Sequence, residues 1–351
     1  MNGRRNVSAL ATIMEWCRTR KADGEFHGKT RGDFRRWRGP FAHNYRRSLG
    51  PWPERVPPRL KVTGRKDMGD YVRERIIYDS SPGVTVPAFL LTPKGICPGE
   101  RRPALLAAHG HGAGKADICG LAFEGKDKTW IKWVRHVNYD YAVQAVRRGY
   151  VVIAPDWIPF GERKPPASWI WKTRDACDPA GLAWGYWLPL LTQNVWDAMR
   201  AVDVLAGCPY VDPRRIGVIG ISYGGTMATH ILINDPRVRA GVVSGYLSTV
   251  RYDALNMRGR GNTCGAQHVP GLLRYGDIPD MMGLMAPKPV LFECGKRETC
   301  FHFPDMMRAW KRVRAIYTAA GARDRAAVDI HGYWHRWKGG KAWDWLGKWL
   351  L

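Results

Sequence analysis

Short apolar runs alternate with longer amphipathic segments over most of this 351-residue chain. Runs of about four to eight residues rich in Val, Ile and Leu predict buried strands, whereas longer segments with apolar positions at helical spacing predict helices. Strand-like runs at 73–78 and 84–91 flank a Ser-Ser-Pro-Gly turn and predict a hairpin ahead of the alternation. The further predicted strands are 104–109, 150–154, 215–219, 240–245, 289–293 and 327–330, and the predicted helices are 139–148, 194–205, 226–233, 304–320 and 341–350. This alternation predicts an α/β fold, with a doubly wound, mostly parallel sheet and helices on both faces.

The first part of the chain lacks the alternation. Residues 1–70 are basic, aromatic and interrupted by Gly and Pro, so we interpret them as an N-terminal extension laid over an α/β domain at 71–351. One helix is expected near 9–20. The dense basic stretch at 31–47 mixes Gly, Pro and aromatic residues and is not predicted to form a helical face.

The segment 157–191 also departs from the alternation and is rich in aromatic residues. It follows the predicted strand 150–154, and ligands of open α/β sheets bind beyond the carboxyl ends of the strands. We therefore expect this insertion either to form a lid or substrate platform, or only to pack its rings onto the domain. The aromatic residues are Trp157, Trp169, Trp171, Trp184, Tyr186 and Trp187.

Composition adds a large positive charge to this picture. The chain has 55 Lys and Arg against 31 Asp and Glu, a formal charge of +24, and its hydrophobic content of 45% is ample for a sizeable core. Such a charge would attract an acidic partner or steer an anionic substrate. The basic residues do not form a recognisable nucleic-acid-binding module, so we expect no nucleic-acid partner.

Membrane, targeting and cofactor signals are absent from the sequence. No apolar run approaches the roughly 20 residues that span a bilayer, and the first residues lack the apolar core of a signal peptide. The 8 cysteines form no C-x-x-C pair, so we expect no metal site, and scattered thiols suit a reducing compartment. We therefore expect a cytoplasmic protein without membrane contact and without a metal or organic cofactor, although a secreted chain after trimming would look the same.

A Gly-x-Ser-x-Gly motif at 220–224 lies between the predicted strand 215–219 and the helix-like segment 226–233, with Ser222 at its centre. This pattern is typical of a nucleophile elbow, a sharp strand-to-helix turn that exposes the serine hydroxyl. Gly220 and Gly224 are needed because side chains there would collide where the chain folds back. Ser222 is therefore the candidate nucleophile.

A serine hydroxyl becomes reactive when a histidine takes its proton and an acid orients that histidine, and in this architecture the order is Ser, acid, His. His335 follows the last predicted strand and is the candidate base, whereas His331, at the end of that strand, is expected to be packed. Glu298 lies in the loop after the strand 289–293 and is the candidate acid. Glu293, within that strand, is the alternative.

A serine that attacks a carbonyl group also needs two N–H donors that bind the oxyanion formed in the attack. We expect them to be the backbone amides of Tyr223, which follows the nucleophile, and of His111, in the Gly-rich loop after the predicted strand 104–109. His109 and His111 alone would make a poor metal site, because two histidines at i, i+2 lack further ligands.

With these residues in place, the chain resembles the α/β-hydrolase superfamily, and within it the dienelactone-hydrolase-like families that include acetyl xylan esterase-like proteins. The resemblance covers about residues 70–351 and extends well beyond the elbow. It rests on HGHG at 109–112, GYVVIAPD at 149–156, FGER at 160–163, VWDAMRAVD at 195–203, VDPRRIG at 211–217, PGLLRYGDIPD at 270–280 and APKPVL at 286–291.

The resemblance implies the α/β-hydrolase fold and a catalytic triad of Ser222, His335 and Glu298. Three departures from these families stand out. Such families usually have Asp at the position of Glu298, and Tyr333 and Trp334 replace small residues before the histidine, which should narrow the pocket. The dienelactone hydrolases themselves use Cys where Ser222 stands, so we expect ordinary ester hydrolysis.

We therefore expect a serine esterase that hydrolyses carboxylic esters through an acyl-enzyme. The resemblance implies a short acyl group such as acetyl on a carbohydrate or similar small-molecule alcohol, and the positive charge would suit an anionic substrate. Two alternatives remain: a serine peptidase on the same fold, or a catalytically idle protein that binds an acidic polymer through its aromatic insertion and positive charge.

Overall fold

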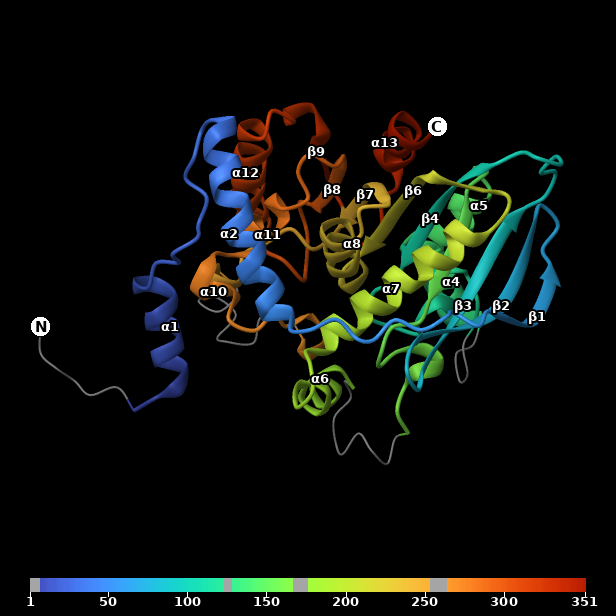
Figure 1. Ribbon diagram of the computed structural model, residues 1–351, viewed down its shortest axis with the longest axis horizontal. Helices are drawn as coiled ribbons and strands as arrows, with labels where there is room; N and C mark the ends of the chain where they lie inside the picture. Colours follow the sequence, from blue (N-terminus) through green and yellow to red (C-terminus); the bar gives the residue numbers. More distant parts are fainter. Residues whose placement is uncertain (1–6, 123–127, 167–175, 253–263) are drawn as a thin grey trace, which may run out of the picture.

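A nine-stranded sheet forms the centre of the computed structural model, which describes residues 7–122, 128–166, 176–252 and 264–351 (Figure 1). The order across the sheet is β1-β2-β3-β5-β4-β6-β7-β8-β9. The first four strands in this order pair antiparallel, and all the pairs from β5 to β9 are parallel. The bounds are β1 Lys61–Asp67, β2 Tyr71–Ser81, β3 Val84–Pro93, β4 Arg102–Ala108, β5 Val151–Pro155, β6 Val211–Ile221, β7 Val238–Ser244, β8 Val290–Gly295 and β9 Ala326–His331.

Helices cover both faces of the sheet. On one face α2, α7, α8 and α12 share a core with the strands, and on the other face α3, α4, α5 and α13 do so. The bounds are α1 Ala9–Thr19, α2 Arg31–Leu49, α3 Lys115–Ile118, α4 Lys128–His136, α5 Tyr141–Val146, α6 Cys177–Gly185, α7 Leu190–Gly207, α8 Tyr223–Asn234, α10 Leu272–Tyr275, α11 Ile278–Gly283, α12 Phe303–Ala319 and α13 Gly340–Leu350. Short 3-10 turns are η1 Gly161–Arg163, η2 Gly265–Gln267 and η3 Arg323–Arg325.

The strand β4 shows why its residues suit a central position. Successive side chains of a strand point to opposite faces, and here Leu106 packs with one core while Leu105 and Ala107 pack with the other. All three are fully buried. A continuous apolar run, rather than an alternating one, is what burial on both faces requires. The predicted doubly wound α/β sheet is therefore confirmed.

The chain order reverses beside β4. After β4 the chain forms β5 on one side, and the next strand, β6, lies on the other side of β4. The loops that leave the carboxyl ends of β4 and β6 therefore diverge, and ligands of open α/β sheets bind at such a point. We therefore expect a ligand to bind at the carboxyl ends of β4 and β6.

The helix α2 corrects the sequence analysis, which predicted no helical face in the stretch 31–47. The helix begins with a capping box between Thr30 and Asp33 and continues through Pro40. A proline within a helix removes one backbone hydrogen bond, but here an apolar stripe at helical spacing anchors the helix against the core. The buried residues of the stripe are Phe34, Phe41, Tyr45 and Leu49.

The one helix that was expected before residue 71, near 9–20, is present as α1. The sheet itself also begins before residue 71, because β1 pairs with β2. In Figure 1, α2 lies beside α12, which comes from the opposite end of the chain. The remaining predicted strands and helices occur within a few residues of their expected bounds. Within the described residues, no helix is both long enough and apolar enough to cross a membrane.

Candidate active site

The turn between β6 and α8 holds Ser222 in a strained backbone conformation. Its φ of 61° and ψ of −123° are rare for a residue with a side chain, and such strain persists only where the surroundings enforce it. The Ser222 N–H donates to the carbonyl of Ser244 in β7 at 3.0 Å. A side chain at Gly224 would overlap the carbonyl of Ala108, so the close packing of α8 on β4 requires glycine there. This is the geometry expected of a nucleophile elbow.

The loop after β4 lies directly against this elbow. A Cβ atom added at Gly110 would come within 3.2 Å of the Ser222 Cβ, and the Gly110 N–H donates to the Tyr139 hydroxyl at 2.7 Å. The His111 ring lies 5.6 Å from the Tyr223 ring, centroid to centroid. Tyr223 begins α8, and the first N–H groups of a helix have no acceptor within the helix. The two expected oxyanion donors therefore come from neighbouring segments.

His109 has a structural role in this loop. Its Nε2 accepts a hydrogen bond from the Trp157 N–H at 3.1 Å, and its Nδ1 lies 2.7 Å from the carbonyl oxygen of Gly110. Burial lowers the pKa of His109 to about 4, so the ring is neutral and donates through Nδ1. The buried Lys115 side chain, 2.6 Å from Glu162, ties the same loop to the segment after β5.

His335 reaches the elbow from the loop after β9. Its ring packs against Gly245, where an added Cβ would lie 2.8 Å from the imidazole Cε1 and 3.3 Å from Ile221, the residue before the nucleophile. Two backbone hydrogen bonds, from Lys296 to His331 and from Arg297 to Tyr333, join this loop to the loop after β8. The loops of the candidate base and acid are therefore held together.

Glu298 is the carboxylate that meets the candidate base. Its Oε1 lies 2.8 Å from Nδ1 of His335, and the side chains are 2% and 19% exposed, respectively. The same oxygen accepts the backbone N–H groups of Thr299 and Cys300, each at 2.9 Å, which fixes its position. The contact is a close ion pair in which the Nδ1–H is not aimed directly at the oxygen.

The alternative acid, Glu293, is turned away from this pair. It accepts hydrogen bonds from the backbone N–H of Gly339 at 2.8 Å and from that of Lys338 at 3.3 Å. Burial raises its pKa to about 7. His331, expected to be packed, is indeed buried at the end of β9. Of the two glutamates, the structure brings only Glu298 to His335.

The charge state of His335 depends on its immediate neighbours. Burial by itself lowers the pKa, but the contacts with Cys300 and with Glu298 outweigh burial and raise the pKa of His335 to about 10. A carboxylate oxygen of Glu298, the sulfur of Cys300 and a ring nitrogen of His335 lie within 4.8 Å of one another. Sequence reasoning missed Cys300, because a lone cysteine next to the acid carries no motif.

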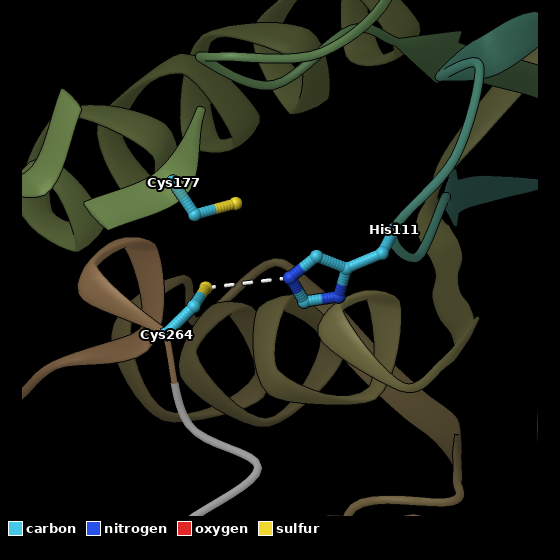
Figure 2. Close-up of side chains that lie close together, drawn as sticks. All are labelled: His111, Cys177 and Cys264. Carbon is cyan, nitrogen blue, oxygen red and sulfur yellow. Dashed lines mark hydrogen bonds between the residues drawn. The ribbon is translucent and has the colours of Figure 1, made fainter. Parts of the chain in front are cut away.

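A second group of side chains that sequence reasoning missed lies at the loop after β4. His111, Cys177 and Cys264 point toward one another from three separate segments (Figure 2). His111 Nε2 is 3.3 Å from the Cys264 sulfur. No local spacing in the sequence pairs His111 with these cysteines, but the fold brings the two thiols close to its ring.

The aromatic insertion is partly packed and partly exposed. Trp157 is fully buried, whereas Tyr186 and Trp187 are 82% and 87% exposed at the end of α6. Trp169 and Trp171 lie outside the described residues. The packing interpretation therefore holds for Trp157, and the two exposed rings are available for contact with a ligand.

The sheet order and the strained strand-to-helix turn are those of the α/β-hydrolase fold. Residues 187–255, which include the elbow, match the prolyl oligopeptidase family. The Bacillus subtilis (strain 168) protein named "Putative hydrolase YtaP" is 27% identical over 287 residues, which are 79% of this chain and 87% of that protein.

Solved structures extend the comparison over nearly the whole chain. A "putative acetyl xylan esterase" (BF1801) from Bacteroides fragilis NCTC 9343 superposes with a TM-score of 0.79 at 18% identity, covering 95% of this chain and 84% of that chain. A glucuronoyl esterase from Solibacter usitatus gives a TM-score of 0.64 at 15% identity, covering 90% of this chain and 92% of that chain. The expected resemblance to α/β-hydrolases and acetyl xylan esterases is thus confirmed in the fold.

Proposed function

We propose that this protein is a carboxylic ester hydrolase that works through Ser222, His335 and Glu298. The observation that carries the proposal is the 2.8 Å approach of His335 Nδ1 to Glu298 Oε1, on loops that adjoin the strained turn holding Ser222. An imidazole that is oriented by a carboxylate and lies near a serine hydroxyl is the arrangement that activates a serine nucleophile.

Hydrolysis would proceed in two steps. In the first, His335 Nε2 takes the hydroxyl proton as Ser222 Oγ attacks the ester carbonyl, and then gives that proton to the leaving alcohol. In the second, His335 activates a water molecule that cleaves the acyl-enzyme and releases the acid. The amides of Tyr223 and His111 would bind the oxyanion, each contributing about 3–4 kcal/mol to transition-state stabilisation.

For the substrate, we propose a short acyl ester, such as acetyl, on a carbohydrate or a similar alcohol. The support comes from fold similarity to proteins named as acetyl xylan and glucuronoyl esterases. The formal charge of +24 favours an alcohol that carries a negative charge.

The direct test is turnover of p-nitrophenyl acetate by the wild-type chain and two variants. Ser222→Ala and His335→Ala should each lower kcat by about three to six orders of magnitude, and the double variant should lose little more, because the residues act as a unit. Ser80→Ala, a buried serine in the β2–β3 hairpin, is the matched control and should retain activity. Wild-type turnover equal to that of Ser222→Ala would instead support an idle binding protein.

A serine peptidase is the second candidate, favoured by the match of residues 187–255 to the prolyl oligopeptidase family. The same nucleophile would serve either reaction, because amides and esters share the tetrahedral intermediate. A chromogenic peptide distinguishes the two: a kcat/KM for the peptide that exceeds the value for acetyl esters would assign the peptidase.

A further inference from the structure

Three donor side chains converge beside the candidate active site. His111 comes from the loop after β4, Cys177 is the first residue of α6, and Cys264 immediately precedes η2 (Figure 2). The imidazole nitrogen and the two sulfurs lie within 4.8 Å of one another. Cys177 is buried, Cys264 is half-buried and His111 is exposed, so the group is open to solvent on the histidine side.

Contacts that do not involve the thiols also hold the segments of the two cysteines together. The Gly265 N–H donates to the Asp178 carboxylate at 2.8 Å, which joins the residue after Cys264 to the residue after Cys177. A Cβ added at Gly181 would come within 2.7 Å of the Gly265 backbone, so α6 and η2 are in close contact.

The adjoining turn is also anchored to the elbow helix. The side chain of Gln267 accepts the Cys264 N–H at 3.1 Å and donates to the Thr226 hydroxyl in α8 at 2.6 Å. The position of Cys264 is therefore set by contacts outside the cluster, and such prior organisation is what a binding site requires.

The spacing suits a tetrahedral metal ion. A zinc ion with Zn–S bonds of about 2.3 Å and a Zn–N bond of about 2.0 Å would hold these donors about 3.6 Å apart. The distance of 3.3 Å between His111 Nε2 and the Cys264 sulfur is close to that value. The present arrangement of the three side chains is therefore close to the one that would coordinate a metal ion, and small side-chain rotations would convert one into the other.

We propose that His111, Cys177 and Cys264 form a binding site for a borderline-soft divalent cation of the Zn²⁺ class. Two sulfurs and one imidazole nitrogen are donors that such ions prefer over the oxygen donors that Mg²⁺ and Ca²⁺ select. Three protein ligands leave a fourth coordination position for water or another small ligand. The site binds its ion whether or not the protein hydrolyses esters, so the proposal stands apart from the proposed function.

The test measures Zn²⁺ binding to the full chain by competition with a chromophoric chelator, in the presence of a phosphine reductant that keeps thiols reduced. The wild-type chain should bind one equivalent of Zn²⁺. Cys177→Ser, Cys264→Ser and His111→Asn should each lower the affinity for Zn²⁺ by at least about tenfold, because each variant removes one ligand. Substitution with Co²⁺ should produce sulfur-to-metal absorption in the wild-type chain that the cysteine variants lose.

The matched control is Cys300→Ser, which alters the other cluster of three donors, Glu298, Cys300 and His335. Cys300→Ser should bind one equivalent of Zn²⁺ with the affinity of the wild-type chain. Circular dichroism checks that each variant is folded, and His111→Asn, at an exposed position, keeps the test valid if Cys177→Ser is unstable. The proposal is wrong if the wild-type chain binds no equivalent, if Cys264→Ser and His111→Asn bind like the wild type, or if only Cys300→Ser loses the ion.

Discussion

Glu293 and Glu298 belong to the same short stretch of chain, yet their surroundings are opposite in kind. Glu293 lies within β8, buried and hydrogen-bonded to the backbone of the loop before α13. Glu298 lies beyond the strand and faces an imidazole. At the scale of single residues, both side chains are glutamates, and only the groups that they contact distinguish the structural carboxyl group of Glu293 from the candidate catalytic one of Glu298.

This contrast predicts different losses in two isosteric variants. Glu298→Gln should lower kcat/KM for p-nitrophenyl acetate by about 10²–10⁴-fold, because the imidazole loses its anionic partner. Glu293→Gln should stay within about threefold of the wild type, because Gln still accepts the amide of Gly339. The opposite ranking would make Glu293 the acid.

For the free energy of unfolding, in contrast to activity, we expect Glu293 to be the glutamate with a clear effect. Because burial raises the pKa of Glu293 from 4.5 to about 7, the folded chain holds this proton more tightly than the unfolded chain does. The resulting stabilisation is present below pH 4.5 and is lost as pH rises to about 7. Glu293→Gln should remove this decline, which is worth roughly 1–3 kcal/mol. Urea unfolding at several pH values measures the effect.

The protonation of His335 should determine how kcat/KM depends on pH. A general base works only when neutral, so kcat/KM should rise with pH through the pKa of His335. Since the contacts with Cys300 and Glu298 raise that pKa, the rise should fall well above the usual value of about 6.5. Cys300→Ser should shift it to lower pH. A wild-type midpoint at or below the usual value, or an unshifted variant, would contradict this assignment.

At the scale of elements, α2 is the instructive case. Gly39 and Pro40 are poor helix formers, and by local propensity they interrupt the segment. The helix forms nonetheless because its apolar stripe packs against the core, and tertiary burial outweighs propensity. One buried contact ties it to α8: the Tyr45 hydroxyl lies 2.6 Å from His230 Nδ1 and accepts from Asn234 at 2.8 Å.

We therefore expect Tyr45→Phe to destabilise the whole domain. Removal of the hydroxyl leaves the buried His230 and the half-buried Asn234 without this partner, which should cost about 1–3 kcal/mol of unfolding free energy. Denaturant unfolding measures the loss, and kcat should be unchanged because the contact is remote from Ser222. Tyr186→Phe, at a position 82% exposed, is the control. Equal stability of both variants would mean that α2 adds little to the domain.

At the scale of the molecule, the sheet topology places the candidate catalytic loops at one edge. The loops after β4, β6, β8 and β9 all leave the carboxyl ends of parallel strands, so residues far apart in the chain meet there. The positive charge is likewise a property of the whole surface, with 55 basic against 31 acidic residues. Such a field acts on the approach of a charged ligand and is screened by salt.

This field leads to a prediction on substrate charge. For an acetylated uronic acid, kcat/KM should fall several-fold between about 20 mM and 500 mM NaCl, because salt screens the attraction. For the acetyl ester of the matching neutral sugar, kcat/KM should remain nearly constant. Equal salt dependence of the two esters would show that the charge does not guide the substrate.

The sequence by itself determined the strands from 71 onward, five of the helices among them and the position of the elbow, whereas it did not predict α3, α4, α6, α10 and α11. The predicted features follow from short-range physics: apolar periodicity decides strand or helix, and glycines around Ser222 permit one sharp turn. It also limited the candidate base and acid to a few residues, because the loops after the last strands must lie near the elbow.

Only the tertiary structure decided which of these residues meet. It paired Glu298 with His335, formed α2 against its local propensity, and brought Cys177 and Cys264 to His111. None of these follows from spacing in the sequence, because each depends on how distant segments pack. Contacts between loops are set by the whole fold, whereas periodicity and turn chemistry are set by neighbouring residues alone.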